Sequence, residues 1–234
     1  MKKIQELVFL GASTAFLEIL DIVNDINKNG LRYKVIAILD DNDKLHGTEI
    51  EGIKVEGPLS FVEKYPRAKF VFGIGSIKTK SIRMQILNKL NLPAERFVTL
   101  IHPNTKIYPN AKIGYGCVIH FGSVIGANTV IEDFTIIAFH SIIGNYVKIG
   151  KGSMITSSVT ILSMVEVGEC VFIGSGSCLA EGINIGSNAM VGMGTVLARD
   201  VTAEEFVVGN PPRNLGKADI WLKKLGGSGN NEQK

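Results

Sequence analysis

The chain has 234 residues, of which 45% are hydrophobic and 20% charged, and its formal net charge at pH 7 is +3. This length suits one large domain or two small ones. The nearly balanced charge argues against a nucleic-acid-binding surface, and no stretch approaches the roughly 20 apolar residues of a membrane-spanning helix.

The first hundred residues have the alternating pattern of a small parallel α/β domain. Strands are expected at 7–10, 33–39 and 69–75, and helices at 15–27 and 78–90. Ser13 or Thr14 can cap the first of these helices. Glycines follow the first and third strands, where strand ends should meet helix N-termini, and turns of this kind suit a phosphate group.

A dinucleotide-binding fingerprint is absent from this region. The stretch 11–16 contains a single glycine, Gly11, in place of the three that the motif requires. Binding of a nicotinamide dinucleotide is therefore not expected. The glycines are equally compatible with ordinary strand ends, since such turns are common after strands in α/β folds.

From Ile101 onward an aliphatic residue returns at every sixth position, through seventeen consecutive hexads of which the last begins at Leu197. The fifth position of each hexad is small, with Ile183 as the one large exception. Neither a helix nor an ordinary strand has a six-residue period, so the pattern predicts a repeat architecture. Three hexads form one triangular coil with the first and fifth side chains pointing inward, and the core exists only in the stack.

The three cysteines, Cys117, Cys170 and Cys178, all fall within the hexads and show no CxxC spacing. They are interpreted as small apolar fillers of a protein in a reducing compartment, which makes the cytoplasm the expected location. After the repeat, 218–225 can form a short amphipathic helix, and 226–234 is a polar, glycine-rich tail.

The hexad series resembles that of the hexapeptide-repeat proteins, whose fold is a left-handed parallel β-helix, and the left hand is taken from this resemblance. The whole arrangement further resembles the family of sialic acid O-acetyltransferases and bacillosamine N-acetyltransferases, over nearly the full chain. The resemblance rests on five stretches: Gly11-Ala12-Ser13, Leu39-Asp40-Asp41, Phe72-Gly73-Ile74-Gly75, Thr99-Leu100-Ile101-His102-Pro103 and Val208-Gly209-Asn210-Pro211-Pro212.

The resemblance implies a Rossmann-like nucleotide-sugar-binding domain at 1–98, a β-helix acetyl-CoA domain at 99–216, and a helix with a flexible tail at 217–234. Acetyl-CoA, the expected co-substrate, would lie in a groove between two subunits of a homotrimer, and no metal is expected. The implied nucleotide-sugar contacts are Asp40 and Asp41 at the base or ribose, and Gly11, Ser13, Gly73 and Gly75 at the diphosphate or sugar. The implied CoA contacts are Gly174, Ser175, Gly192, Gly194, Asn210, Pro211 and Arg213.

The family keeps its general base, a histidine, at the third position of the eighth hexad, and this chain departs from that pattern. Its eighth hexad is 143–148, and the third residue is Asn145. An asparagine does not accept a proton under mild conditions, although its amide can orient a hydroxyl or a carbonyl. His140, at a corner of the seventh hexad, is the candidate base. An exposed corner histidine without a role is the alternative.

The other histidines are expected elsewhere: His46 in a loop, His102 in a structural role at the domain junction, and His120 on the outer surface. Three aromatic residues are expected to face outward and to expose apolar surface that a partner can cover, namely Phe121, Phe139 and Tyr146.

The resemblance implies an N-acetyltransferase that uses acetyl-CoA and acts on a UDP-linked amino sugar for a bacterial surface glycan such as lipopolysaccharide. Attack by an amine suits a site without the family histidine, because an amine is a stronger nucleophile than a hydroxyl. Two alternatives remain: a sialic acid-type O-acetyltransferase, and a non-catalytic trimeric scaffold that binds a nucleotide sugar.

Overall fold

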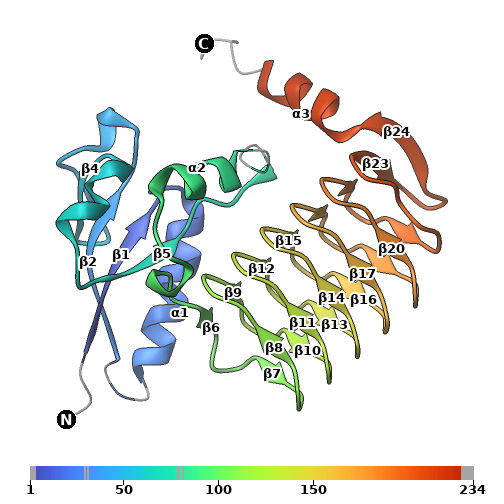
Figure 1. Cartoon of the computed structure of the whole chain (residues 1–234), viewed down its shortest axis with the longest axis horizontal. Coiled ribbons are helices and arrows are strands. Elements are labelled where there is room, and N and C mark those ends of the chain that lie inside the picture. The colour runs from blue at the N-terminus through green and yellow to red at the C-terminus, as the bar shows by residue number, and fades with distance from the viewer. Residues whose placement is uncertain (1–3, 29, 31, 78–79, 81, 228–234) are drawn as a thin grey trace.

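The computed structural model describes residues 4–28, 30, 32–77, 80 and 82–227. These residues form an α/β domain, a stack of β-coils and a C-terminal helix (Figure 1). Of the tail expected at 226–234, residues 228–234 lie outside this description.

The N-terminal domain is built on a five-stranded sheet of order β3-β4-β2-β1-β5. Its elements are β1 (Gln5–Leu10), α1 (Thr14–Lys28), β2 (Tyr33–Leu39), β3 (Glu49–Ile50), β4 (Ile53–Gly57), β5 (Lys69–Phe72) and α2 (Arg83–Leu90), with 3-10 helices at Asp43–Leu45, Leu59–Lys64 and Ala94–Arg96. β1 pairs in parallel with β2 and β5, and β2 with β4, which confirms the expected parallel sheet. The apolar side of α1 packs against this sheet and buries the end of β1.

Three local features differ from the sequence prediction. The third expected strand ends at Phe72, so 73–75 is a turn. The second helix begins at Arg83 rather than at 78, and residues 78, 79 and 81 lie outside the description. An antiparallel hairpin of β3 and β4 forms the sheet edge, and its two-residue first strand is too short to leave a periodic pattern.

The hexads form a parallel β-helix in which every predicted aliphatic residue ends a two-residue strand. The strands are β6 (Leu100–Ile101), β7 (Lys106–Ile107), β8 (Lys112–Ile113), β9 (Val118–Ile119), β10 (Val124–Ile125), β11 (Val130–Ile131), β12 (Ile136–Ile137), β13 (Ile142–Ile143), β14 (Lys148–Ile149), β15 (Met154–Ile155), β16 (Thr160–Ile161), β17 (Glu166–Val167), β18 (Phe172–Ile173), β19 (Cys178–Leu179), β20 (Asn184–Ile185), β21 (Met190–Val191) and β22 (Val196–Leu197). Each strand from β6 to β19 pairs with the strand three further along, as in β10 with β13, so that one coil spans eighteen residues.

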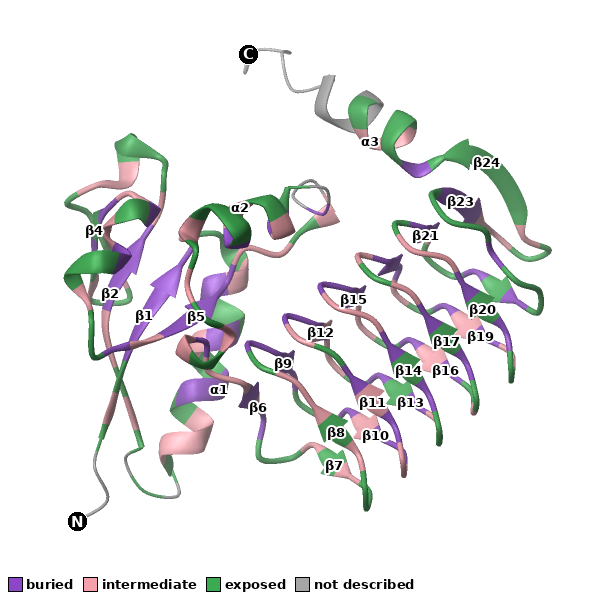
Figure 2. Ribbon diagram, viewed as in Figure 1, coloured by how far each residue is buried: buried purple, intermediate pink, exposed green. Residues whose placement is uncertain are grey.

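The β-helix has three faces that differ in their outward side chains. The covered face (β6, β9, β12, β15, β18, β21, then β23 and β24) lies under the N-terminal domain and the C-terminal helix. The charged face consists of β8, β11, β14, β17 and β20, and the open apolar face of β7, β10, β13, β16, β19 and β22. Figure 2 shows the covered-face strands from β6 to β23 largely buried, whereas β24 is exposed and the charged-face strands β8, β14 and β17 are partly exposed.

Turns join the faces along three edges, each named here after one residue. The His140 edge leads from the covered to the open apolar face, and the Asn145 edge leads from there to the charged face. The Phe134 edge returns to the covered face.

Fifth-position side chains are buried, as predicted, from Cys117 to Val201, whereas Thr105 and Ala111 in the first two hexads are partly buried. Their hydroxyls are satisfied by the backbone of the next coil: Ser153 Oγ, for example, donates to the Gly168 carbonyl at 2.8 Å. Glycines at the second position allow the coils to stack. A Cβ added to Gly144 would lie 2.7 Å from the Ser163 nitrogen.

The C-terminal segment closes the stack. β23 (Glu205–Val208) pairs in parallel with β21, and β24 (Arg213–Lys217) runs antiparallel to β23. The helix α3 (Ala218–Gly227) follows, close to the predicted range. Its Trp221 ring lies 4.8 Å from the Phe206 ring, so this helix extends the cover over the covered face.

Candidate functional site

A cavity of about 330 Å³ opens at the carboxyl ends of β1, β2 and β5. Its lining includes Gly11, Ser13, Asp40, Asp41 and Gly75, together with Leu59, Ile74, Ser76, Ile82 and Ile86. The structure thus brings together five of the six predicted nucleotide-sugar residues. Gly73, the sixth, precedes the lining residue Ile74 and does not itself line the cavity.

The two aspartates of this pocket hold its loops. The Asp40 carboxylate accepts the Ala12 amide at 2.7 Å and the Asn42 amide at 2.8 Å, and Asp41 accepts the Leu59 amide at 2.9 Å. These contacts fix both carboxylates at the mouth of the pocket and leave further lone pairs for hydroxyl groups. They also give each aspartate a structural reason to be present.

The first glycine turn joins β1 to α1 beside this pocket. Gly11 has a φ of +104°, and a Cβ there would lie 2.7 Å from Cγ1 of Ile74, so only glycine fits. α1 begins at Thr14; its Phe16 amide donates to the Ser13 carbonyl at 2.9 Å, and its N-terminus carries the positive end of the helix dipole. The turn and the helix terminus together suit an anionic group.

His140 lies exposed on its edge of the β-helix, with a left-handed φ of 55°. Its ring packs edge-on against Phe121 at 5.2 Å, and Phe121 packs likewise against His102 at 5.1 Å. Within the described part of the chain, no hydrogen bond to either ring nitrogen of His140 is found. The side chain is therefore open to solvent and to a ligand.

Asn145 lies on the neighbouring edge, across the open apolar face from His140. Its Oδ1 accepts the Ala127 amide of the preceding coil at 2.8 Å. Asp133 makes the same contact with the Tyr115 amide at 2.8 Å, and Ser187 with the Glu169 amide at 3.1 Å. Asn145 thus stabilises coil stacking through its oxygen, and its exposed NH₂ group remains available as a donor.

The predicted CoA residues follow the His140 edge toward the C-terminal end of the stack. They are Gly174, Ser175, Gly192 and Gly194, and beyond them Asn210, Pro211 and Arg213 after β23. Gly209 continues this edge, since its amide donates to Thr195 Oγ1 at 3.1 Å. Nothing lies within 4 Å of a Cβ placed on Gly194, so the edge is open there. Asn145 is not on this edge.

The expectation that His120 lies on the outer surface is wrong. Its side chain is 3% exposed, and its ring lies 4.5 Å from that of Phe139, which is only half-buried. Burial, and secondarily the nearby His102, lowers the pKa of His120 to about 4. His120 directly follows β9, where the chain turns from the covered face along the His140 edge, and the hexad pattern carries no information on the side chains that bury it there. Phe121 and Tyr146 are exposed as expected.

The two remaining histidines support the fold. His102 Nε2 lies 2.6 Å from Asp25 Oδ2 and links α1 to the β-helix, in agreement with the structural role expected at the junction. His46 Nε2 lies 2.8 Å from the Asp40 carbonyl oxygen and steadies the loop that carries that aspartate.

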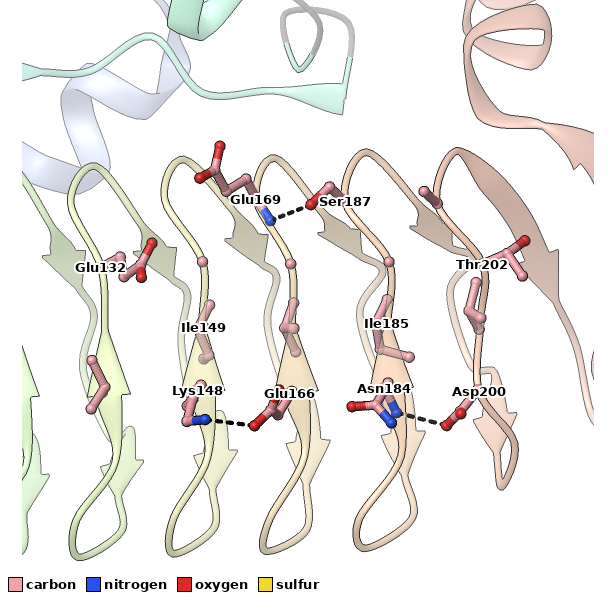
Figure 3. A pocket seen from close by; sticks show the side chains of 17 residues that line it. Glu132, Lys148, Ile149, Glu166, Glu169, Asn184, Ile185, Ser187, Asp200 and Thr202 are labelled. Carbon is pink, nitrogen blue, oxygen red and sulfur yellow. Dashed lines mark hydrogen bonds and ion pairs between the residues drawn. The ribbon is translucent and has the colours of Figure 1, made fainter.

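A second cavity, about 790 Å³, is a trough on the charged face that the sequence did not suggest (Figure 3). Lys148 pairs with Glu166 at 2.6 Å, and the backbone amide of Asn184 donates to the Asp200 carboxylate at 2.8 Å. Its floor includes Ile149 and Ile185. Neither His140 nor Asn145, the two residues predicted for the acyl transfer, lines this trough.

No group of three or more histidine, cysteine or acidic side chains among the described residues is arranged to hold a metal ion. No described helix is long and apolar enough to cross a membrane.

No protein-family model matches the sequence, and no curated protein matches it. Solved structures do. The acetyltransferase domain of PglB from Neisseria gonorrhoeae FA1090 has 24% identity and a TM-score of 0.79, covering 90% of this chain and 100% of that one. An H→N mutant of perosamine N-acetyltransferase from Caulobacter crescentus, in complex with CoA and GDP-perosamine, has 22% identity and a TM-score of 0.80, covering 93% and 100%.

A mutant of AntD, an N-acyltransferase from Bacillus cereus in complex with dTDP and coenzyme A, is more distant. It has 17% identity and a TM-score of 0.50, covering 62% of this chain and 94% of that one. At these identities the likeness concerns the fold. The chain has the predicted fold class, a small parallel α/β domain followed by a left-handed parallel β-helix, and shares it with the PglB domain and the perosamine N-acetyltransferase.

Proposed function

We propose that the protein transfers an acetyl group from acetyl-CoA to the amino group of a nucleotide-linked sugar. The observation that carries this proposal is the pocket at the carboxyl ends of β1, β2 and β5, with its glycine turn and helix N-terminus, attached to a complete β-helix. The Caulobacter structure has this fold throughout and contains both CoA and a GDP-linked amino sugar.

Within that function we propose UDP as the nucleotide, because the glycine turns and the acidic pair resemble those of the bacillosamine N-acetyltransferase family. The similar structures contain GDP-perosamine and dTDP, so the nucleotide varies within the fold. Nucleotide sugars and acetyl-CoA are both used in the cytoplasm, and we place the protein there, in the synthesis of a surface glycan.

A homotrimer completes the proposed site. The outward residues of the open apolar face are mostly uncharged, and Ile142 and Val196 are 49% and 43% exposed. No described segment covers these two residues, whereas the N-terminal domain and the C-terminal helix pack over the covered face. Packing of this face around a threefold axis would bring the His140 edge of one subunit against the Asn145 edge of its neighbour, because these edges flank the same face.

The chemistry proposed for this groove uses both edges. The sugar amine attacks the thioester carbonyl, a C–N bond forms, the C–S bond breaks, and CoA leaves as the thiolate. His140 takes the proton released by the amine and passes it to that thiolate. The NH₂ group of Asn145 in the neighbouring subunit donates to the oxyanion that develops at the carbonyl.

A histidine-to-asparagine replacement is compatible with ligand binding in this fold. The Caulobacter enzyme with a histidine replaced by asparagine was solved with CoA and GDP-perosamine bound. In the present chain Asn145 holds its coil through Oδ1, and its NH₂ group is available as a donor. That arrangement favours an orienting role over a proton-accepting role.

The test is release of free thiol from acetyl-CoA in the presence of UDP-, GDP- and dTDP-linked amino sugars and of sialic acid. We expect turnover with a UDP-amino sugar, and a larger rise in melting temperature with UDP than with GDP or dTDP. Turnover with sialic acid alone would identify an O-acetyltransferase. Nucleotide binding without any thiol release would contradict the proposal and leave a binding scaffold.

A further inference from the structure

Arg83, the first residue of α2, is almost completely buried, with 1% of its surface exposed. Ile82 and Ile86, four residues apart and thus on one side of the helix, line the nucleotide pocket. Arg83 and Leu87 have the same spacing and are buried. Arg83 therefore lies directly behind the pocket wall, between it and the β-helix.

The guanidinium of Arg83 joins three backbone carbonyls from two domains. Its Nε donates to Ile74 at 2.6 Å, its Nη1 to Gly152 at 2.9 Å and its Nη2 to Phe134 at 3.1 Å. Phe134 and Gly152 occupy the same place in two successive coils on the Phe134 edge. One rigid side chain thus connects the 73–75 turn after β5 to two coils of the β-helix.

No carboxylate contact with this cation is found among the described residues. Burial lowers the pKa of Arg83 to about 10, so the group stays charged at neutral pH. Burying a guanidinium without a counter-charge is unfavourable, and apolar residues of similar volume often replace buried ions at no loss of stability. The fixed geometry of its fork is what an apolar side chain would not reproduce.

The turn held by Arg83 is itself packed from both sides. A Cβ on Gly11 would lie 2.7 Å from Cγ1 of Ile74, and a Cβ on Gly75 would lie 2.7 Å from Cδ1 of Ile136 on the covered face. Ile74 and Gly75 also line the pocket. A shift of this turn would therefore move the pocket wall relative to the coils.

We propose that Arg83 is a positioning residue of the transferase: it fixes the nucleotide-sugar pocket against the β-helix, so that the sugar amine and the thioester meet at reacting distance. This inference rests on the proposed function. Its energetic basis is that a misplacement of about 1 Å can lower the rate of a bound reaction about 100-fold.

The test compares Arg83→Lys with Lys80→Met. Lys80 is also a buried cation, 6% exposed, and donates to the Asn188 carbonyl of the β-helix at 2.8 Å. No hydrogen bond from Lys80 to the pocket turn is found in the described part of the structure. We expect Arg83→Lys to lower kcat about 100-fold, with dissociation constants for CoA and the nucleotide nearly unchanged. Lys80→Met should have the native kcat at temperatures below the melting temperature of the variant.

Hydrogen exchange supplies a readout that needs no activity. Arg83→Lys should speed amide exchange at 73–77, whereas Lys80→Met should not. The inference would be overturned if Arg83→Lys had the kcat and the amide exchange of the native protein. It would also be overturned if Arg83→Lys and Lys80→Met lost kcat equally. If the native protein transfers no acetyl group, the proposed function fails, and exchange alone still decides whether Arg83 fixes the turn.

A second variant tests the same wall should Arg83→Lys not fold. Gly75→Ala places a methyl against Ile136 and leaves Arg83 intact. If the position of the pocket wall sets the rate, we expect Gly75→Ala to lower kcat and to leave the affinity for CoA unchanged. An unchanged kcat in Gly75→Ala would contradict the positioning role.

Discussion

The covered face and the open apolar face of the β-helix have the same backbone and the same inward residues, yet different surroundings. The outward residues Val118, Met154 and Met190 of the covered face are at most 5% exposed. Ile142 and Val196 hold the corresponding positions of the open apolar face and are 49% and 43% exposed. The repeat therefore specifies the coil, whereas the outward position specifies what each face packs against.

The largest effect is expected from a charge on the open apolar face. Ile142→Glu places a carboxylate where we propose that three subunits meet, and burial of an unpaired charge is strongly unfavourable. We expect a monomer by light scattering and loss of turnover. Lys148→Glu, on the charged face, is the matched control and should stay trimeric. A monomeric native protein, or a trimeric Ile142→Glu, would contradict this use of the face.

The His140 edge borders the same face and is expected to provide the base. His140→Gln removes the proton acceptor and should lower kcat about 1,000-fold, within the usual contribution of general base catalysis. KM for acetyl-CoA should change little. An unchanged kcat would show that His140 is not the base. The rate would then come from positioning of the reactants, and a group of the substrate would accept the proton.

The Asn145 edge allows a closely matched comparison. Asn145→Asp should still accept the Ala127 amide, as Asp133 accepts that of Tyr115 in the same geometry. It removes the NH₂ donors and adds a negative charge, so we expect kcat to fall about 100-fold through loss of oxyanion stabilisation. The melting temperature should be nearly unchanged. A normal kcat in this variant would reduce Asn145 to its part in coil stacking.

The contrast between the faces also separates what the sequence predicts from what it does not. The period located every strand from β6 to β22 and every inward side chain, because a hexad is a local pattern. It misplaced His120, and it gave no sign that Arg83 and Lys80 are buried. Their surroundings come from segments far along the chain, and no local pattern encodes such a contact.

The same limit applies to the candidate site. The glycine turns and the acidic pair could be located, because strand ends of a parallel sheet meet at one place. The separation of His140 and Asn145 onto two edges follows from counting hexads around the coil. The exposed apolar face between them emerges only when the outward residues of one sheet, eighteen positions apart, are viewed together.

The smallest expected effect concerns pH and compares two histidines of the His140 edge, the buried His120 and the exposed His140. Burial lowers the pKa of His120 from 6.5 to about 4. Between these values the unfolded chain takes up a proton that the folded chain does not, so stability falls as the pH falls through this window. The full loss is about 3 kcal/mol and is reached below pH 4. His120→Leu should remove this part of the pH dependence in urea unfolding at fixed protein concentration, and His140→Gln should not. Parallel pH profiles for the native protein and His120→Leu would show that the cover over His120 admits water in solution.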